Sequence, residues 1–220
     1  ADKVLISAPG KKCEATIIIG VNESMLKDQK IVSAGSCTTN CVAPLVKILD
    51  GAFQIENAFF ITTHAYTSSQ HLVDAFEKKD DVRGRAAGVN IIPTTSGAAT
   101  SVIEAVPGLK GKLDGYALRV PVVDGSIASL IAKVKKKVTK DKVNSLFKIK
   151  AQKQLKGIVQ YSDEKLVSTD IIGNTNSCIF DSNLTYVNGD LVSIAAWYDN
   201  EMGYAYRLVD IAKLMLKNKY

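Results

Sequence analysis

The sequence predicts an α+β fold, with a mixed, mostly antiparallel sheet and helices flanking it. Runs rich in β-branched and aromatic residues outnumber helical segments after residue 50 and rarely alternate with them, which argues against a doubly wound sheet in that region. The helical segments carry apolar residues at three- and four-residue spacing. With 46% hydrophobic residues in 220, the chain can bury one sizeable core and an appended fragment.

The strands are predicted from short apolar runs that contain many β-branched and aromatic residues. These runs lie at residues 4–7, 15–21, 57–63, 116–123, 126–134, 177–181 and 191–198. A further strand-like stretch ends at residues 30–33.

Helices are predicted over residues 40–49, 98–105, 139–148 and 204–218. Pro44 argues against a regular helix that begins as early as Cys37, because proline removes an interior hydrogen bond. The last helix carries one apolar stripe, for which the sequence alone suggests few partners; it consists of Leu208, Ile211, Ala212 and Met215.

Composition excludes several classes of protein. No run approaches the ~18 apolar residues that a membrane span needs, and no signal peptide precedes the first strand. The four cysteines, at positions 13, 37, 41 and 178, form no CxxC pair, and with two histidines no metal site is expected. A reduced, cytoplasmic location fits this pattern best.

The formal net charge of +6 comes largely from lysines between residues 133 and 156. Such a run is most often a solvated face, although it could also attract nucleic acid or phosphorylated substrates. Few aromatic residues are interleaved with these lysines, which argues against a nucleic-acid partner.

Residues 36–41, with the sequence SCTTNC, lie between a strand-like and a helical segment. At such a junction, the unpaired N–H groups and the helix dipole would lower the pKa of the Cys37 thiol and favour the nucleophilic thiolate. The flanking hydroxyls and Asn40 are N-cap types that could also hold an anion. A buried cysteine beside an ordinary capping cluster is the alternative, and the residues alone leave both open.

Six blocks, including this one, resemble in order and spacing the phosphorylating glyceraldehyde-3-phosphate dehydrogenases. The other blocks are HAYT at 64–67, RGRAA at 83–87, PTTSGAA at 93–99, LRVP at 118–121 and WYDNE at 197–201. The resemblance runs from Val4 to the C-terminus. One departure is Gly35, where the family pattern has alanine.

The family begins with a nucleotide-binding half that carries a Gly-x-Gly-x-x-Gly turn, and the 15 glycines here form no Gly-x-Gly. The resemblance therefore implies the C-terminal portion of such an enzyme. Residues 1–34 would be a remnant of the Rossmann-type dinucleotide-binding domain, 35–199 the catalytic domain, and 200–220 a C-terminal helix packing on the dinucleotide-binding domain. The chain alone is expected to lack activity and useful NAD affinity without the N-terminal half.

The resemblance implies a mechanism in which Cys37 adds to an aldehyde to give a thiohemiacetal. Hydride loss to a nicotinamide then gives a thioester, which phosphate attacks. His64 would be the general base, because its ordinary pKa near ~6.5 suits proton transfer near neutral pH. From the residues alone, His64 would be a hydrogen-bonded histidine at a strand end.

The remaining site residues also follow from the resemblance, by the group that they would bind. Those around the attacking inorganic phosphate are Ser36, Thr38, Arg83, Ser96 and Gly97. Those on the substrate phosphate are Thr67 and Arg119. Those on the cofactor are Ser7, Asn200 and Tyr204. Without the resemblance, Asn200 would be interpreted as the N-cap of the last helix and Tyr204 as a core residue.

The implied function is a glycolytic oxidoreductase that converts glyceraldehyde 3-phosphate, phosphate and NAD(P) to 1,3-bisphosphoglycerate, a homotetramer in its full-length form. NAD is the expected cofactor, and NADP stays open because residues 74–76, within the cofactor-lining loop, match neither family tripeptide. The alternatives are an erythrose-4-phosphate dehydrogenase, a truncated non-catalytic assembly or binding module, and a cysteine hydrolase, which would leave the phosphate residues unexplained.

Overall fold

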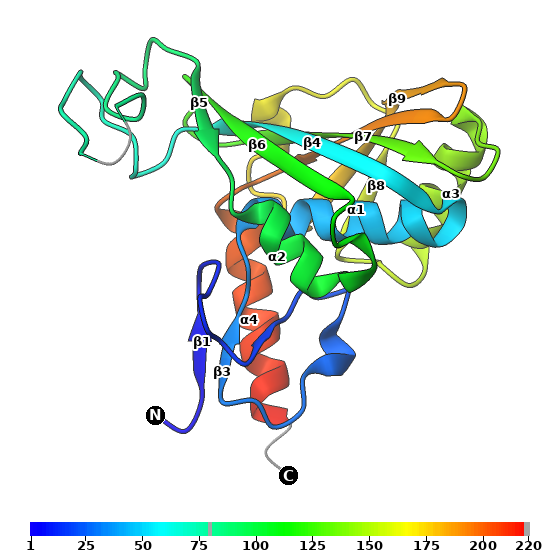
Figure 1. Ribbon diagram of the computed structural model, residues 1–220, viewed down its shortest axis with the longest axis horizontal. Helices are drawn as coiled ribbons and strands as arrows, with labels where there is room; N and C mark the ends of the chain where they lie inside the picture. The colour runs from blue at the N-terminus through cyan, green and yellow to red at the C-terminus, as the bar shows by residue number, and fades with distance from the viewer. Residues whose placement is uncertain (79–80, 218–220) are drawn as a thin grey trace.

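A seven-stranded sheet forms the larger part of the fold in the computed structural model, which describes residues 1–78 and 81–217 (Figure 1). Its strands are β4 (Ile55–Ala65), β5 (Ile92–Thr95), β6 (Leu113–Val120), β7 (Ser126–Val134), β8 (Val159–Ser162), β9 (Cys178–Asn188) and β10 (Leu191–Tyr198). The strand order is β5-β6-β4-β7-β10-β9-β8. The β4–β6 and β8–β9 pairs are parallel and the other pairs antiparallel. The predicted mixed, mostly antiparallel sheet of an α+β fold is confirmed.

Three helices cover one face of this sheet: α1 (Cys37–Phe53), α2 (Ala98–Ala105) and α3 (Lys140–Gln152). In Figure 1, α1 runs across the sheet beneath its central strands. The apolar residues of α1 pack against β7 and β10 in one continuous core, in which Leu45, Leu130 and Ile194 are fully buried. Apolar burial of this kind supplies most of the stability of a domain.

A smaller parallel sheet has the order β1-β3-β2, with β1 at Val4–Ile6, β2 at Ala15–Thr16 and β3 at Ile31–Ser33. Helix α4 (Met202–Lys217) packs against it through Ile211 and Met215. In the apolar stripe predicted on this helix, Ile211 and Met215 are buried and Leu208 packs against them in part, so the expectation that the stripe would lack partners is wrong. The domain boundaries at residues 34 and 199 stay predictions.

Most predicted elements are found, with differences at their ends. The strands at 126–134 and 191–198 and the helix at 98–105 have the predicted bounds. The strand expected at 15–21 ends at Thr16, because Asn22 folds back to accept from the Ile18 N–H and to donate to the Thr16 carbonyl. Strands β5 and β8 were not predicted, and residue 218 of the last helix lies outside the described residues.

The start of α1 corrects the expectation drawn from Pro44. The helix begins at Cys37 and continues through Pro44. Its start is fixed by a capping box, in which the Ser36 hydroxyl accepts from the Thr39 N–H and the Thr39 hydroxyl accepts from the Ser36 N–H. These bonds satisfy helix donors at the N-terminus, so the start does not depend on the donor that Pro44 lacks.

Three short 3₁₀ helices complete the regular elements among the described residues, at Glu23–Met25, Pro107–Leu109 and Ser168–Ile171. No helix in the described part of the chain is both long enough and apolar enough to cross a lipid bilayer. All four cysteines are free.

Gly115 on β6 pairs with Phe60 on β4, and a methyl group at Gly115 would lie 2.5 Å from the Phe60 carbonyl oxygen. We expect Gly115→Ala to lower the free energy of unfolding by about 1–3 kcal/mol, because the two central strands must separate to admit the methyl group. In the matched control, Gly51→Ala in α1, the added atom meets nothing within 4 Å. This substitution should raise the free energy of unfolding by up to about 1 kcal/mol. Urea unfolding of both variants measures these changes, and an equal change in the free energy of unfolding for the two variants would contradict the prediction.

Candidate active site

Cys37 and His64 lie in contact, with 3.4 Å between the cysteine Sγ and the histidine Nε2. Cys37 is the first residue of α1 and His64 lies near the end of β4. The turn that delivers Cys37 from β3 passes through Gly35, whose φ of +64° is a left-handed conformation that favours glycine. The fold thus joins a helix start to a strand end and places a thiol beside an imidazole.

Arg119 contacts the opposite nitrogen of His64. The parallel register of β4 and β6 pairs His64 with Arg119, and the arginine Nη1 lies 2.6 Å from His64 Nδ1. The same Nη1 donates to the Ala65 carbonyl oxygen at 3.2 Å, while Nδ1 itself lies 2.7 Å from that oxygen. His64 is 2% exposed, so these contacts form away from water.

Burial sets the protonation of the pair. Burial, together with the positive charge of Arg119, lowers the pKa of His64 to about 4, opposed only in part by the Ala65 carbonyl. Burial raises the pKa of the Cys37 thiol, and this outweighs the Thr38 N–H and the charge of Arg119. The sequence prediction of a lowered thiol pKa is therefore wrong for this arrangement, in which a neutral thiol faces a neutral imidazole.

The buried Tyr198 contacts residues on both sides of the Cys37–His64 pair. The Tyr198 hydroxyl lies 3.0 Å from Thr38 Oγ1 and 2.7 Å from Thr62 Oγ1, and its ring meets the His64 ring edge-on at 5.8 Å between centroids. Burial raises the pKa of Tyr198 well above its usual value, so it stays a neutral phenol. Sequence reasoning missed Tyr198 as a site residue, although it lies within the WYDNE block.

Two arginines bring positive charge to the site. Burial lowers the pKa of Arg119, and the positive charge of Arg83 lowers it further, whereas Tyr198 and Cys37 act in the opposite direction. The two guanidinium groups therefore lie within electrostatic reach of each other. Two neighbouring cations at a partly buried site favour an anionic ligand.

The other residues predicted to bind phosphate make contacts within their own turns. The Ser36 hydroxyl caps α1, and the Ser96 hydroxyl accepts from the Ala98 N–H at the start of α2, where Gly97 leaves open space. Thr67 Oγ1 lies 3.0 Å from Ser69 Oγ and donates to Gln70 Oε1 at 3.1 Å. Of the predicted phosphate ligands, Arg119 contacts His64 directly, and Thr38 hydrogen-bonds the Cys37 sulfur.

A family model described as glyceraldehyde 3-phosphate dehydrogenase, C-terminal domain, matches residues 36–200. The chain belongs to this family. It is 50% identical over 214 residues to glyceraldehyde-3-phosphate dehydrogenase 2 of Streptomyces avermitilis, which covers 96% of this chain and 64% of the relative. It is 48% identical over 219 residues to glyceraldehyde-3-phosphate dehydrogenase of Mycobacterium avium, with 99% and 64% covered.

A plant relative matches to a similar degree. The chloroplastic glyceraldehyde-3-phosphate dehydrogenase GAPA1 of Arabidopsis thaliana is 48% identical over 220 residues, which covers 99% of this chain and 55% of the relative. The chain thus spans less than two thirds of the length of these relatives. The resemblance found in the six sequence blocks is confirmed.

The residues expected to bind the cofactor in this dehydrogenase family lie in two places. The Asn200 Oδ1 accepts from the Gly125 N–H and from the Ser126 hydroxyl, and its Nδ2 lies 3.5 Å from Glu201 Oε1. The Tyr204 hydroxyl donates to the Gly35 carbonyl oxygen at 2.8 Å. Ser7 is exposed and follows β1 in the smaller sheet.

Asp199 corrects the interpretation of Asn200 as the N-cap of the last helix, and Ser126 adds a site residue that the sequence did not predict. Asp199, rather than Asn200, caps α4: its Oδ1 accepts from the Glu201 and Met202 N–H groups. Ser126, which sequence reasoning missed, accepts from the Ala65 N–H and donates to Asn200. Asn200 is thereby tied to the strand end that holds His64. The one sequence signal at Ser126 was its place at the start of a predicted strand.

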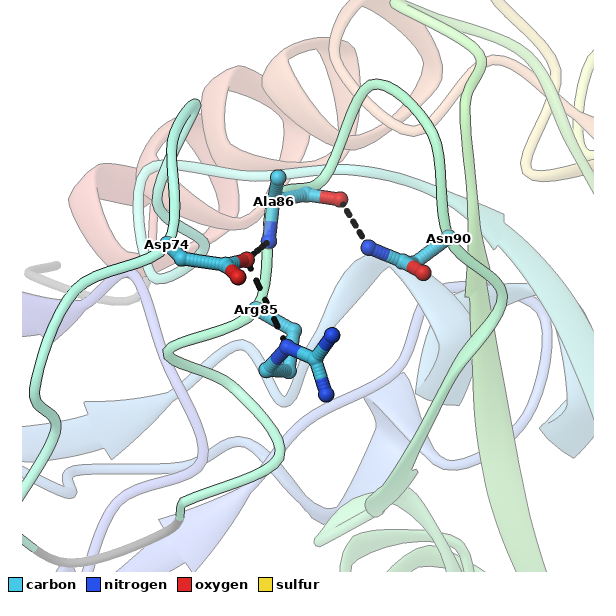
Figure 2. A network of polar contacts seen from close by, with 4 residues as sticks. All are labelled: Asp74, Arg85, Ala86 and Asn90. Carbon is cyan, nitrogen blue, oxygen red and sulfur yellow. Dashed lines mark hydrogen bonds and ion pairs between the residues drawn. The ribbon is translucent and has the colours of Figure 1, made fainter.

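Residues 66–78 and 81–91 belong to the long connection between β4 and β5, and Figure 1 shows this loop projecting beyond β5. Within it, Asp74 accepts from the Ala86 N–H and from Arg85 Nε, and Asn90 donates to the Ala86 carbonyl (Figure 2). The hydrogen bond from the Ala86 N–H lowers the pKa of the exposed Asp74 carboxyl, and the charge of Arg85 lowers it to a smaller extent. These bonds join the two arms of the loop around the segment that carries Arg83.

The low pKa of His64 predicts a pH dependence of stability. The unfolded chain binds a proton at His64 below about pH 6.5, whereas the folded chain does so only near pH 4. The folded state therefore loses up to about 3 kcal/mol through this residue as the pH falls from 7 to 4. Urea unfolding at both pH values should show a smaller loss for His64→Asn than for the unchanged chain. His71→Asn, in the loop, is the control; a loss in His64→Asn as large as in the unchanged chain would contradict the assignment.

Proposed function

We propose that this chain supplies the catalytic domain of a phosphorylating dehydrogenase that converts glyceraldehyde 3-phosphate, inorganic phosphate and NAD(P) to 1,3-bisphosphoglycerate. The observation that carries the proposal is the 3.4 Å contact between the Cys37 Sγ and His64 Nε2, with Arg119 alongside. A thiol, a base and a cation for a phosphate group are the components that this reaction needs. Membership of the glyceraldehyde 3-phosphate dehydrogenase family supports the same assignment.

The reaction begins when the Cys37 sulfur bonds to the aldehyde carbon and the carbonyl π bond breaks. The thiol proton passes to His64 Nε2, and His64 returns a proton to the carbonyl oxygen to give the hydroxyl of the thiohemiacetal. The resulting thiohemiacetal loses a hydride and a hydroxyl proton to become a thioester; a nicotinamide nucleotide, when bound, supplies the hydride acceptor, and His64 takes the proton. A phosphate oxygen then bonds to the thioester carbon, and Cys37 leaves as the thiolate. The thiolate regains its proton from His64, so the products are an acyl phosphate and a Cys37 thiol ready for another cycle.

The phosphate groups are assigned by the donors available. Arg119 and Thr67 would hold the phosphate of the aldehyde, because Arg119 lies beside the reacting pair. The attacking phosphate would be held near the starts of α1 and α2, where helix N-termini favour anions. Its proposed ligands are Ser36, Thr38, Arg83, Ser96 and Gly97.

The residues present fit a nicotinamide. Two donors fix the Asn200 Oδ1. Its Nδ2 makes a long contact of 3.5 Å with Glu201 Oε1, and an amide nitrogen has two N–H groups, so one can bond a carboxamide oxygen. Tyr204 reaches the Gly35 carbonyl, two residues before Cys37. We assign Asn200, Tyr204 and, in the smaller sheet, Ser7 to the cofactor, with NAD as its expected form and NADP open.

We extend the proposal to a homotetramer and a cytoplasmic location for the full-length enzyme. The support for assembly is apolar surface: the loop at 66–91 exposes Leu72, Val73, Phe76 and Val89. Exposed apolar groups of this size commonly mark an interface between proteins.

The thioester step can be tested without a nucleotide, by running it in reverse. Acetyl phosphate should place one acetyl group on Cys37, releasing inorganic phosphate, because the Cys37 sulfur attacks the acyl carbon as in the proposed reaction. Mass spectrometry should find no acetyl group in Cys37→Ser and the full amount in the control Cys13→Ser. His64→Asn should slow acetylation by about 10²-fold or more. Acetylation of Cys13 at the rate of Cys37 would reject the assignment.

The aldehyde is identified by a second assay on the full-length enzyme, because this chain alone is expected to lack useful NAD affinity. Reduced nucleotide should form from glyceraldehyde 3-phosphate faster than from erythrose 4-phosphate, and only with inorganic phosphate present. The reverse order of rates would favour the erythrose-4-phosphate dehydrogenase. Acetylation of Cys37 without reduced nucleotide from either aldehyde would show that this chain carries out the acyl-transfer chemistry alone.

A further inference from the structure

Three of the four cysteines follow one another from the candidate site into the core. Cys37 opens α1 and is partly exposed, Cys41 lies one helical turn further along α1, and Cys178 is the first residue of β9. Cys41 and Cys178 are both 0% exposed. The proposed reaction uses Cys37 alone, so the two buried thiols have no part in it.

The packing of α1 on the sheet brings the two buried thiols together. The Cys41 sulfur lies 4.0 Å from the carbonyl oxygen of Ala196 on β10. Ala196 pairs with Phe180 on the neighbouring strand β9, and Cys178 lies two residues before Phe180, on the same face of the sheet. The Cys178 thiol thereby reaches the Cys41 thiol, and the two share a hydrogen bond. Cys37, one turn away on the helix, is near enough to act on Cys41 electrostatically.

Burial decides where an oxidant can enter this group of thiols. Burial raises the pKa of Cys41 well above its usual value, and the neighbouring Cys178 raises it further. A protonated thiol without contact to solvent reacts slowly with dissolved oxidants. Cys37 is partly exposed, and its sulfur lies 3.4 Å from His64 Nε2, which can take the thiol proton. A peroxide therefore reacts first at Cys37.

We propose that Cys41 and Cys178 are a reserve thiol pair, which takes over the oxidation of Cys37 by a peroxide and stores it as a disulfide between Cys41 and Cys178. The inference goes beyond the proposed function and needs neither nucleotide nor aldehyde. Its product is a Cys37 thiol that has been restored after oxidation.

The transfer takes three steps. The Cys37 sulfur first bonds to one oxygen of hydrogen peroxide while the O–O bond breaks, which gives a sulfenic acid and water. The Cys41 sulfur then bonds to the Cys37 sulfur, and the sulfenic hydroxyl leaves as water with the Cys41 proton. Finally the Cys178 sulfur bonds to the Cys41 sulfur, and Cys37 leaves and takes up the proton that Cys178 loses. In total, two thiols are oxidised to a disulfide and hydrogen peroxide is reduced to water.

Helix geometry explains why the oxidation does not stay on Cys37. The Cβ atoms of residues four apart in an α-helix are separated by about 5–6 Å, whereas a disulfide needs about 3.5–4.5 Å. A bond between Cys37 and Cys41 therefore distorts the first turn of α1, which the capping box of Ser36 and Thr39 holds in place. A strained disulfide is easily reduced. Cys178 belongs to a different element, so its bond to Cys41 leaves the helical turn intact.

The disulfide can be located by peptide mapping. The chain is treated with an equimolar amount of hydrogen peroxide, its free thiols are blocked with N-ethylmaleimide in urea, and it is digested with trypsin without reduction. Trypsin leaves Cys37 and Cys41 together in residues 31–47 and Cys178 in residues 166–207. We expect these two peptides to be linked, with N-ethylmaleimide on Cys37. A bond between Cys37 and Cys41 as the end product, or a sulfinic acid on Cys37 with Cys41 and Cys178 unlinked, would overturn the proposal.

Two variants test the order of events. In Cys178→Ser, Cys37 should end as a disulfide with Cys41 or as a sulfinic acid, because the last acceptor is absent. In Cys37→Ser, the bond between Cys41 and Cys178 should form at least about 10-fold more slowly, because both thiols are buried. An unchanged rate in Cys37→Ser, or a free Cys37 thiol in oxidised Cys178→Ser, would contradict the transfer.

Cys13→Ser is the matched control. The Cys13 sulfur lies 3.9 Å from Thr16 Oγ1 in the smaller sheet, so its loss should leave the mapped disulfide unchanged. If the Cys178 or Cys37 variant fails to fold, the mapping of the unchanged chain decides alone.

Acetylation by acetyl phosphate separates this inference from the proposed function. After oxidation, Cys37 should still accept an acetyl group, because its thiol has been restored. An untreated chain that is not acetylated at Cys37, but that forms the link between Cys41 and Cys178, would reject the proposed chemistry and support the reserve thiol pair. Acetylation that is lost on oxidation, with no such link, would leave the proposed function standing and reject the reserve thiol pair.

Discussion

The parallel pairing of β4 and β6 is the constraint on which the site depends. Its register sets His64 beside Arg119 at the carboxyl ends of two neighbouring strands. A shift by one residue would turn either side chain to the other face of the sheet and separate them. Gly115 helps to fix this pairing, because only a residue without a side chain fits against Phe60. The position of the His64 imidazole thus depends on the contact between Gly115 and Phe60, which lies four residue pairs before His64 and Arg119 along the same two strands.

The second fixed point is the start of α1, which the capping box of Ser36 and Thr39 and the bonds from Asn40 to Ala34 and Ser36 hold in place. It sets the Cys37 sulfur at hydrogen-bond distance from a buried histidine. Burial disfavours a separated thiolate and imidazolium, since each charge loses its hydration. The neutral pair is the less costly state, and nearby helix donors do not overcome this.

Patterns that depend on local sequence were predictable, and features that depend on distant packing were not. The strand at 126–134 alternates buried and exposed residues, and its bounds were predicted without error. Strand β5 contains Pro93, which argues against a central strand; it is tolerated because β5 lies at the edge of the sheet. The pKa of Cys37 was predicted in the wrong direction because its burial comes from elements far away in the sequence.

The candidate site shows the same division. The residues alone left Cys37 and His64 with ordinary alternatives, and the family resemblance brought them together before their 3.4 Å contact was known. Neither route could find Tyr198 or Ser126 as supports, because their hydroxyls join segments separated by more than 60 residues. Such bonds leave no periodic trace, and a hydroxyl residue in a strand has many possible partners.

Arg119 is explained poorly as a stabilising residue. It is partly buried beside a second cation, its Nε has no hydrogen-bond partner in the described part of the chain, and it lowers the basicity of the histidine that it contacts. A side chain selected for stability would be expected to pair its charge with a carboxylate, as Arg207 does with Asp210 on α4. Unsatisfied donors that persist beside reactive groups indicate that the arrangement is completed by a ligand. Because these donors belong to a guanidinium group, we expect that ligand to be an anion able to accept two parallel hydrogen bonds, as a phosphate group can.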